Sequence, residues 1–409
     1  MKQLIITPPS SLQATITLPS SKSICNRALI INALAHGTCT PDNLSDCDDT
    51  RVLIRALDAL PPTIDIMAAG TAMRFLTAYL AVTPGTHLIT GTERMRQRPI
   101  RLLVDALRQL GADIEYAENE GFPPLRITGR HLSNDAISLP GNVSSQYISA
   151  LLMIAPVLEN GLRLTLTGDI VSRPYIDMTL QLMREYGVQA QWTAPDRLEV
   201  QRQEYSSKPY TIESDWSAAS YWYEMAVLSD QATIRLPRLY PHSVQGDAQI
   251  AGLFARLGVT TSFDSEGALL IKKERPGGTL EYDFTHQPDM AQTFVVTCAL
   301  KDIPFRFTGL QSLKIKETDR IAALIAEMRK LGYVLHEAED SILSWDGERT
   351  APDPCPVIDT YEDHRMAMAF APAAIVLGSL RIRHPEVVSK SYPRYWDDLE
   401  QAGFGLTEE

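Results

Sequence analysis

The sequence lacks the features that would place the protein in a membrane, in an oxidising compartment or on nucleic acid. No apolar run reaches the about 18 residues of a membrane-spanning helix, and the apolar part of residues 1–9 is too short for a signal peptide. The five cysteines are odd in number and lack C-x-x-C spacing, so we expect reduced, buried thiols. The net charge of −12 argues against a nucleic-acid-binding protein, which needs a basic face. We therefore expect a cytoplasmic protein with no nucleic acid or membrane as partner.

Several catalytic motifs are also missing. The chain has no G-x-x-x-x-G-K-[ST] phosphate loop, no G-x-G-x-x-G after a strand, no H-E-x-x-H and no G-x-S-x-G. These absences argue against nucleotide hydrolysis, hydride transfer, zinc catalysis and triad hydrolysis. With 44% hydrophobic and 22% charged residues, the composition is that of an ordinary globular protein with sizeable cores.

An internal repeat is present. Six apolar segments with helical periodicity begin at polar or glycine clusters, at Ser23, Gly70, Ser144, Asp215, Asp289 and Asp363. Their starts are spaced by 47, 74, 71, 74 and 74 residues, which favours duplication over coincidence. A short alternating strand follows each segment, and then a second helix that ends at glycine or proline, at 50–60, 100–110, 175–186, 249–257, 321–331 and 395–402. The sequence thus predicts an α/β fold in which one β-α-β-α-β-β unit is written six times.

Six such units exceed what one hydrophobic core holds, so we expect two domains of three units each. The break should fall just before the fourth unit, between Thr211 and Asp215. Residues 1–18 form strands without a leading helix and are expected to complete the second domain. The predicted domains are therefore 20–213, and 1–19 with 214–409. The chain would cross twice, near 19–20 and 213–214, and such a hinge is typical of enzymes that close over ligands.

Basic residues gather where the predicted helices begin. They are Lys22, Arg27, Arg74, Arg94, Arg96, Arg98, Lys314, Lys316, Arg320, His364, Arg365 and Lys390. The arginines at 94, 96 and 98 precede Pro99, a residue suited to the first position of a helix. A cation at a helix N-terminus costs about 0.3 to 1 kcal/mol, so its repetition indicates a ligand that carries several negative charges.

Each motif alone also fits a plain structural role. Lys22 and Arg27 could be solvated, and the three arginines before Pro99 could line a strand edge. Lys316 and Arg320 could form a surface ladder at i, i+4 spacing. Asp289, Ser144 and Ser145 could be helix caps, and His364 a packing residue. The functional interpretation rests on the shared place of all these residues in a repeated unit.

Several strings occur in a characteristic order: S-K-S at 21–23, N-R-A-L at 26–29, G-T-A-M-R at 70–74, R-P-I at 98–100, S-S-Q at 144–146, K-E-T-D-R at 316–320, D-H-R-M-A-M at 363–368 and S-K-S-Y-P at 389–393. Together they resemble the enolpyruvylshikimate-phosphate synthases (3-phosphoshikimate 1-carboxyvinyltransferases) of the enolpyruvyl transferase family. The resemblance runs from about Lys22 to about Leu399. It implies two domains, each a pseudo-threefold set of βαβαββ units, which close over shikimate 3-phosphate and phosphoenolpyruvate. It also implies a monomer with no metal and no organic cofactor.

The resemblance assigns site residues by position. Shikimate 3-phosphate would bind to the domain at 20–213, with further contacts from the second domain. The binding residues would be Lys22, Ser23, Arg27, Ser144, Ser145, Gln146, Ser172, Asp289, Ser312 and Lys316. Phosphoenolpyruvate would contact Lys22, Gly70, Arg98, Gln146, Arg320, Arg365 and Lys390. In this addition and elimination the 5-hydroxyl attacks C2 of the enolpyruvate. Asp289 is the expected base, Glu317 the expected acid at C3, and Lys22 assists the proton transfers and the leaving phosphate.

The sequence departs from the family pattern at three positions. Ala68 stands where most relatives have Asn, Phe75 stands where Pro is usual, and Ser312 replaces an Asn that contacts shikimate 3-phosphate. Two alternatives are weighed against the main interpretation. The sister transferase that acts on UDP-N-acetylglucosamine carries a cysteine before its R-P, and here 92–99 has none. A non-catalytic anion-binding homologue would need neither Asp289 nor Glu317.

Overall fold

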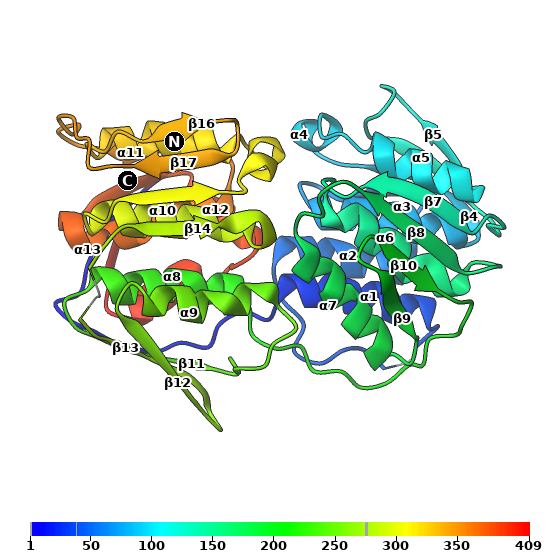
Figure 1. The fold of residues 1–409 in the computed structure, drawn as a ribbon, viewed down its shortest axis with the longest axis horizontal. Helices are drawn as coiled ribbons and strands as arrows, with labels where there is room; N and C mark the ends of the chain where they lie inside the picture. Colours follow the sequence, from blue (N-terminus) through cyan, green and yellow to red (C-terminus); the bar gives the residue numbers. More distant parts are fainter. Residues whose placement is uncertain (1, 38, 275–276) are drawn as a thin grey trace. The chain divides into compact units, whose positions relative to one another are not determined.

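The computed structural model describes residues 2–37, 39–274 and 277–409, and one repeated motif accounts for most of it (Figure 1). Five four-stranded sheets occur among these residues. In each sheet the first strand of the motif lies parallel to the second, and the fourth strand lies between the second and the third. The α/β fold of β-α-β-α-β-β units predicted from the sequence is confirmed.

The chain divides into two compact units. We call residues Ser20–Glu213 the insert unit and residues Met1–Pro19 with Ser214–Glu409 the terminal unit. The chain passes from the terminal unit to the insert unit after Pro19 and returns after Glu213.

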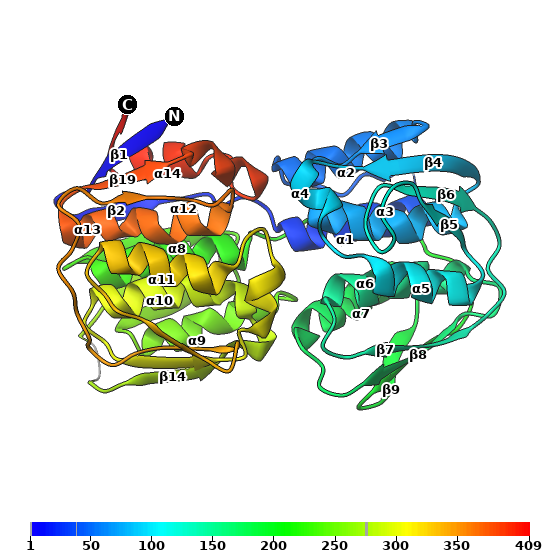
Figure 2. The ribbon, with the colours of Figure 1, turned by 90° about the horizontal axis from the view of Figure 1, so that it is seen from above.

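The terminal unit contains three complete motifs. The first is β2 (Leu12–Thr15), α8 (Trp216–Leu228), β11 (Ala232–Pro237), α9 (Ile250–Ala255), β12 (Val259–Asp264) and β13 (Gly267–Lys272). The second is β14 (Leu280–Asp283), α10 (Ala291–Leu300), β15 (Phe305–Thr308), α11 (Arg320–Lys330), β16 (His336–Ala338) and β17 (Ile342–Trp345). The third is β18 (Val357–Ile358), α12 (His364–Phe370), α13 (Ala374–Leu377), β19 (Leu380–Arg383), α14 (Tyr395–Gln401), β20 (Gly405–Glu408) and β1 (Gln3–Thr7). Figure 2 shows β1 beside β19, where the N-terminal strand completes the sheet of the last motif.

The insert unit contains two complete motifs and one reduced motif. The complete motifs are β3 (Thr63–Asp65), α3 (Gly70–Val82), β4 (Gly85–Thr90), α4 (Glu93–Arg96), α5 (Arg101–Leu110), β5 (Asp113–Tyr116) and β6 (Leu125–Gly129), and then β7 (Ala136–Pro140), α6 (Ser145–Ile154), β8 (Leu162–Thr167), α7 (Arg173–Glu185), β9 (Ala190–Ala194) and β10 (Arg197–Val200). The reduced motif keeps α1 (Lys22–Leu34) and α2 (Asp48–Ala59). The strand predicted between these helices is reduced, in residues 39–47, to one parallel bridge between Asp42 and Thr211.

The first helix of each motif lies in the centre of its unit. Helices α8, α10 and α12 pack together in the terminal unit, as do α1, α3 and α6 in the insert unit. All 10 residues of α10 are buried, which explains why its sequence is apolar on every side. The second helices are amphipathic; α5 buries Leu103, Val104 and Leu107 and ends at Gly111, whose φ of 107° suits glycine. The central helices therefore bring their N-terminal turns, with the predicted site residues, into one neighbourhood of each unit.

The structure corrects three local predictions. Pro99 is not the first residue of a helix, because α5 begins at Arg101 and the preceding Ile100 has a non-helical φ of −136°. Lys316 and Arg320 do not form a helical ladder, because Asp319 caps α11 through its Oδ1, which accepts from Ala322 N at 3.0 Å, and the helix starts only at Arg320. Lys390 ends the 3-10 helix Pro385–Lys390 and does not open α14. No helix in the described ranges is both long and apolar enough to span a bilayer.

Candidate active site

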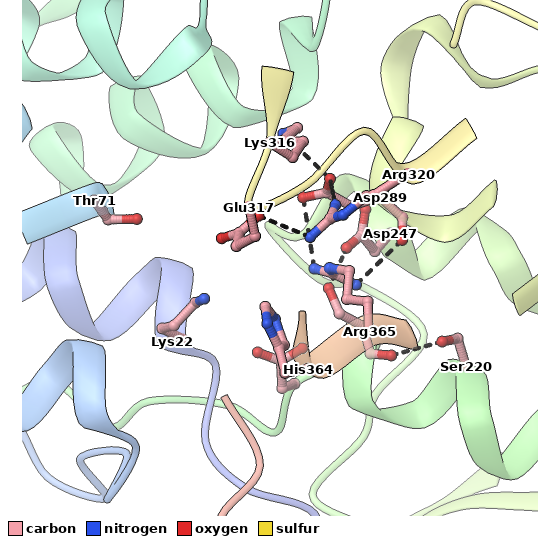
Figure 3. A network of polar contacts seen from close by, with 12 residues as sticks. Lys22, Thr71, Ser220, Asp247, Asp289, Lys316, Glu317, Arg320, His364 and Arg365 are labelled. Carbon is pink, nitrogen blue, oxygen red and sulfur yellow. Dashed lines mark hydrogen bonds and ion pairs between the residues drawn. The ribbon is translucent and has the colours of Figure 1, made fainter. Parts of the chain in front are cut away.

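One buried guanidinium holds three carboxylates in the terminal unit (Figure 3). Arg320 is 1% exposed and is the first residue of α11. Its Nε donates to Asp363 Oδ2 at 2.6 Å, its Nη1 to Asp289 Oδ1 at 2.8 Å, and its Nη2 to Glu317 Oε2 at 3.0 Å. The two acids predicted for proton transfer, Asp289 and Glu317, therefore share one guanidinium.

Three more of the predicted cations contact the same acids. Lys316 Nζ lies 3.2 Å from Asp289 Oδ1, and Arg365 Nη2 lies 3.6 Å from Asp289 Oδ2. Lys390 Nζ donates to Glu317 Oε1 at 2.6 Å. We call these residues the Arg320 cluster: Asp289, Lys316, Glu317, Arg320, Asp363, Arg365 and Lys390. Its four cations outnumber its three carboxylates, and such an excess of positive charge favours the binding of anions.

The starts of three helices deliver these side chains. Asp289 lies in the 3-10 turn Pro288–Met290 that leads into α10. Asp363 caps α12, because its Oδ1 accepts from the main-chain N of Arg365 at 2.9 Å. Arg365 in turn donates from Nη1 to the main-chain oxygen of Asp289 at 3.2 Å, which joins two of these helix starts.

Electrostatics in the cluster keep Asp289 and Arg320 charged. Burial alone would raise the pKa of Asp289, but the charges of Lys316, Arg365 and Arg320 outweigh burial and hold that pKa well below its usual range. Burial would lower the pKa of Arg320, and Asp363, Glu317 and Asp289 raise it instead. Asp289 is therefore a carboxylate at neutral pH, and it is a weak proton acceptor as long as these cations face it.

Sequence reasoning missed Asp247, a buried acid beside this cluster. Asp247 lies in the 3-10 helix Gly246–Gln249, and Ser217 Oγ donates to its Oδ2 at 2.5 Å. Burial raises the pKa of Asp247 to about 6, against the opposing effects of Ser217 and Arg365. Asp363 was also missed as a site residue, although its motif was noted. Asp363 begins a repeated helix, which was a usable signal, whereas Asp247 lies outside the repeated positions and only its contacts reveal it.

In the insert unit, two of the predicted phosphoenolpyruvate residues, Lys22 and Gly70, lie at the starts of α1 and α3. Lys22 is the first residue of α1, and its Nζ lies 3.4 Å from Oδ2 of the buried Asp49 on α2. Gly70 begins α3, and a Cβ at this position would lie 2.7 Å from Arg98 Nη1. Glycine therefore lets the guanidinium of Arg98 rest against the first turn of α3.

Arg27 is a buried cation without a carboxylate among its described contacts. It is 2% exposed, and it donates to Thr179 Oγ1 at 2.7 Å, to Ser149 Oγ at 3.0 Å and to the main-chain oxygen of Ser23 at 2.9 Å. Its guanidinium also lies 5.2 Å from the ring centre of Phe75, one of the residues that depart from the family pattern. Burial lowers the pKa of Arg27 to about 10. A buried charge held only by neutral groups is well suited to an anionic ligand.

The predicted serine and glutamine residues surround the starts of α6 and α7. Ser144 caps α6, Ser145 is its first residue, and Gln146 Nε2 donates to Thr71 Oγ1 at 3.1 Å, which joins the starts of α6 and α3. Ser172 precedes α7 with a φ of 54°, a left-handed conformation that is uncommon for serine. In the terminal unit, Ser312 lies in the 3-10 helix Gln311–Ile315, and its buried hydroxyl has no hydrogen-bond partner among the described residues.

Other candidates lie apart from these sites. Arg96 pairs with Glu93 at 3.2 Å, and Lys314 pairs with Glu337 at 2.6 Å, both as surface ion pairs. His364, in contrast, lies beside the Arg320 cluster: it is 2% exposed at the start of α12, and its Nδ1 is 3.6 Å from Asp363 Oδ1 (Figure 3). One exposed group of metal-ligand types, His336, Asp346 and Glu348, lies near β16 and β17, where His336 Nε2 and Glu348 Oε2 are 3.0 Å apart.

Comparisons with known proteins agree with one another. The family model described as EPSP synthase (3-phosphoshikimate 1-carboxyvinyltransferase) matches residues 6–65 and 61–399. A 3-phosphoshikimate 1-carboxyvinyltransferase of Bacteroides fragilis is 65% identical over 402 residues, which are 98% of each chain. One from Vibrio campbellii is 34% identical, with 98% of this chain and 99% of the relative covered.

Solved structures share the fold. An EPSP synthase from Acinetobacter baumannii aligns with a TM-score of 0.80 at 21% identity, with 100% of both chains covered. The enolpyruvyl transferase NikO from Streptomyces tendae aligns with a TM-score of 0.73 at 16% identity, with 100% of this chain and 99% of that chain covered.

Proposed function

This chain belongs to the EPSP synthase family, the 3-phosphoshikimate 1-carboxyvinyltransferases, and we propose that the Arg320 cluster together with Lys22 carries out the reaction of that family. The enzyme transfers the enolpyruvyl group of phosphoenolpyruvate to the 5-hydroxyl of shikimate 3-phosphate and releases phosphate, a step of aromatic amino-acid biosynthesis. One observation carries the assignment of residues. Asp289 and Glu317 share the Arg320 guanidinium and are further paired with Lys316, Arg365 and Lys390.

The proposed binding residues answer the charge of the substrates. Two phosphates and two carboxylates repel one another unless cations lie between them, and Arg suits planar carboxylates. Phosphoenolpyruvate is proposed to bind Lys22, Gly70, Arg98, Gln146, Arg320, Arg365 and Lys390. Shikimate 3-phosphate is proposed to bind Lys22, Ser23, Arg27, Ser144, Ser145, Gln146, Ser172, Asp289, Ser312 and Lys316. The buried Arg27 and the unpartnered hydroxyl of Ser312 support this second set.

The charge balance of the cluster supports a mechanism. When the anionic substrates draw Lys316, Arg365 and Arg320 away from Asp289, its carboxylate loses the interactions that hold its pKa low, and it becomes a better base. Asp289 can then accept the proton of the attacking 5-hydroxyl. Glu317 is proposed to enter the reaction in its protonated form, to protonate C3 to a methyl group and to take a proton back as phosphate leaves, with Lys22 stabilising the leaving group.

The activity is tested by phosphate release from the purified protein with shikimate 3-phosphate and phosphoenolpyruvate. UDP-N-acetylglucosamine replaces shikimate 3-phosphate as the control. Phosphate release with shikimate 3-phosphate, but not with UDP-N-acetylglucosamine, supports the proposal. Release only with the sugar nucleotide would move the chain to the sister activity. No release with either acceptor, from folded protein, would favour a non-catalytic homologue.

The roles of the acids are tested by the double variant Asp289→Asn, Glu317→Gln. Turnover should be lost while calorimetry still detects binding of shikimate 3-phosphate, because the cations remain in place. Turnover within a few-fold of the wild type would refute these roles. The single variants Asp289→Asn and Glu317→Gln separate the addition step from the elimination step. For each variant one measures how the tetrahedral adduct, formed when the 5-hydroxyl adds to C2, divides between return to substrates and release of products.

We also propose that the enzyme is a cytoplasmic monomer and that its domains close on binding, because the proposed residues are divided between the two units. Small-angle X-ray scattering tests the monomeric state and the closure. The mass should equal one chain of 45.4 kDa, and the radius of gyration should fall when both ligands are added. An unchanged radius with saturating ligands would contradict closure.

A further inference from the structure

A strained turn immediately precedes the acid that holds Arg320. Tyr361 and Glu362 have φ values of 54° and 56°, and Asp363 N donates to the main-chain oxygen of Thr360 at 2.8 Å. Two consecutive central residues with positive φ are a feature of type I′ turns, which favour Gly, Asn and Asp. Tyr and Glu have no such preference, so contacts around the turn must impose its conformation.

Those contacts come from one buried carboxylate on α11. Glu327 is 0% exposed; its Oε1 accepts from Tyr361 Oη at 2.6 Å, and its Oε2 accepts from Asp359 N at 3.0 Å. Lys330 Nζ donates to Glu327 Oε2 at 2.7 Å and to the main-chain oxygen of Val357 at 2.9 Å. The carboxylate of Glu327 thus holds the residue before the turn and a central residue of the turn itself.

The same helix contacts the end of the turn at a second point. Asp363, the last residue of the turn, accepts from Arg320 Nε at 2.6 Å and from Arg320 Nη2 at 3.2 Å. Arg320 and Glu327 are seven residues apart on α11, which is about two helical turns, so both face the segment that leads into α12. A change in the turn at the Glu327 end therefore moves Asp363, and with it the guanidinium that holds Asp289 and Glu317.

We propose that Glu327 and Tyr361 are positioning residues for enolpyruvyl transfer. They hold the turn 360–363 in its left-handed form, so that Asp363 directs Arg320 toward Asp289 and Glu317. This inference rests on the proposed role of Arg320 at phosphoenolpyruvate.

The variant Tyr361→Phe removes the hydroxyl from Glu327 and leaves the ring, which is 39% exposed, in place. We expect kcat/KM for phosphoenolpyruvate to fall about tenfold, a change of about 1.4 kcal/mol, while KM for shikimate 3-phosphate stays within about twofold of the wild type. The split is expected because Arg320, the residue that Asp363 directs, belongs to the set proposed for phosphoenolpyruvate and not to the set proposed for shikimate 3-phosphate. Tyr223→Phe is the matched control; Tyr223 Oη bonds Thr261 Oγ1 at 2.8 Å elsewhere in the terminal unit, and its loss should leave both parameters unchanged.

A second substitution tests the turn itself. Glycine adopts positive φ readily, so Glu362→Gly should make the turn less dependent on its clamp. In the double variant Tyr361→Phe, Glu362→Gly we expect kcat/KM for phosphoenolpyruvate to return to within about twofold of the wild type. Glu362→Val should act in the opposite direction, because a β-branched residue is strongly disfavoured at positive φ.

Hydrogen exchange gives a readout that does not depend on turnover. In Tyr361→Phe the amides of residues 359–365 should exchange faster, while those of α8 keep their wild-type rates. Equal losses in Tyr361→Phe and Tyr223→Phe, or no recovery with Glu362→Gly, would overturn the proposal. If the wild type itself released no phosphate, the proposed function would fail, and the exchange rates of residues 359–365 would still decide whether Tyr361 holds the turn.

Discussion

Replacement of Asp363 by Asn tests whether the Arg320 cluster is also a structural element of the terminal unit. Asp363 is 0% exposed, and its carboxylate accepts two hydrogen bonds from Arg320, which is itself 1% exposed. The substitution Asp363→Asn keeps the shape of the side chain and removes its charge. It also keeps an oxygen for the cap of α12, and Asn and Asp cap helices about equally well.

The magnitude follows from the loss of one partner of a buried ion pair, which costs about 3–5 kcal/mol. Arg320 retains Asp289 and Glu317, so we expect the lower end of that range, about 3 kcal/mol. For a unit of this size the melting temperature should fall by about 6–12 °C. Since Arg320 is then drawn toward its two remaining acids, kcat/KM for phosphoenolpyruvate should fall as well.

Urea unfolding followed by tryptophan fluorescence measures this loss. Trp216, Trp222, Trp345 and Trp396 lie in the terminal unit, so the signal reports mainly on that unit. Asp319→Asn is the matched control, because Asp319 caps α11 through Ala322 N at 3.0 Å and makes no ion pair among the described residues. The control should change stability by less than about 0.5 kcal/mol. If Asp363→Asn were no more destabilising than Asp319→Asn, the assigned contribution of the buried pair would be refuted.

Three further predictions concern single positions. Gly70→Ala should raise KM for phosphoenolpyruvate about tenfold with little loss of stability, because the added Cβ would displace the flexible end of Arg98. Steady-state kinetics and thermal unfolding measure the two effects, and an unchanged KM would show that the assignment is wrong. Thr179→Val removes the acceptor of Arg27 Nε and should weaken shikimate 3-phosphate binding about tenfold, which calorimetry measures; equal affinity would contradict the role of Arg27. Folding raises the pKa of Asp247 from 3.8 to about 6, so as the pH rises Asp247 loses its proton more readily in the unfolded state than in the folded state. The free energy of unfolding of the wild type should therefore fall by up to about 3 kcal/mol between about pH 4 and about pH 6. Urea midpoints across that range should show this loss in the wild type and its absence in Asp247→Asn.

Helix starts were predictable because their signals are local. Gly70 begins α3, and Asp215 and Asp363 cap α8 and α12, as caps and apolar periodicity indicate. The strand after α1 was not predictable in the same way. Residues 39–47 contribute one bridge at Asp42, since a sheet needs partner strands that a local pattern does not reveal.

Part of the cluster was visible in the sequence and part was not. Lys316, Glu317 and Arg320 stand close together in one string, and their charges at the start of a repeated helix indicated an anion site. The contact of Arg320 with Asp289 and Asp363 joins residues 31 and 43 positions away. Asp247 and Glu327 lie outside the repeated helix starts, and only burial and hydrogen bonding mark them as important.

The sequence by itself thus determined the repeated motif, the α/β fold, the family and the cationic character of the helix starts, because periodicity, caps and charge are properties of neighbouring residues. The tertiary structure alone decided which acid meets which cation, and which turn holds them. The reason is physical: the pKa of Asp289 and the place of Arg320 depend on desolvation and on charges brought together from distant parts of the chain.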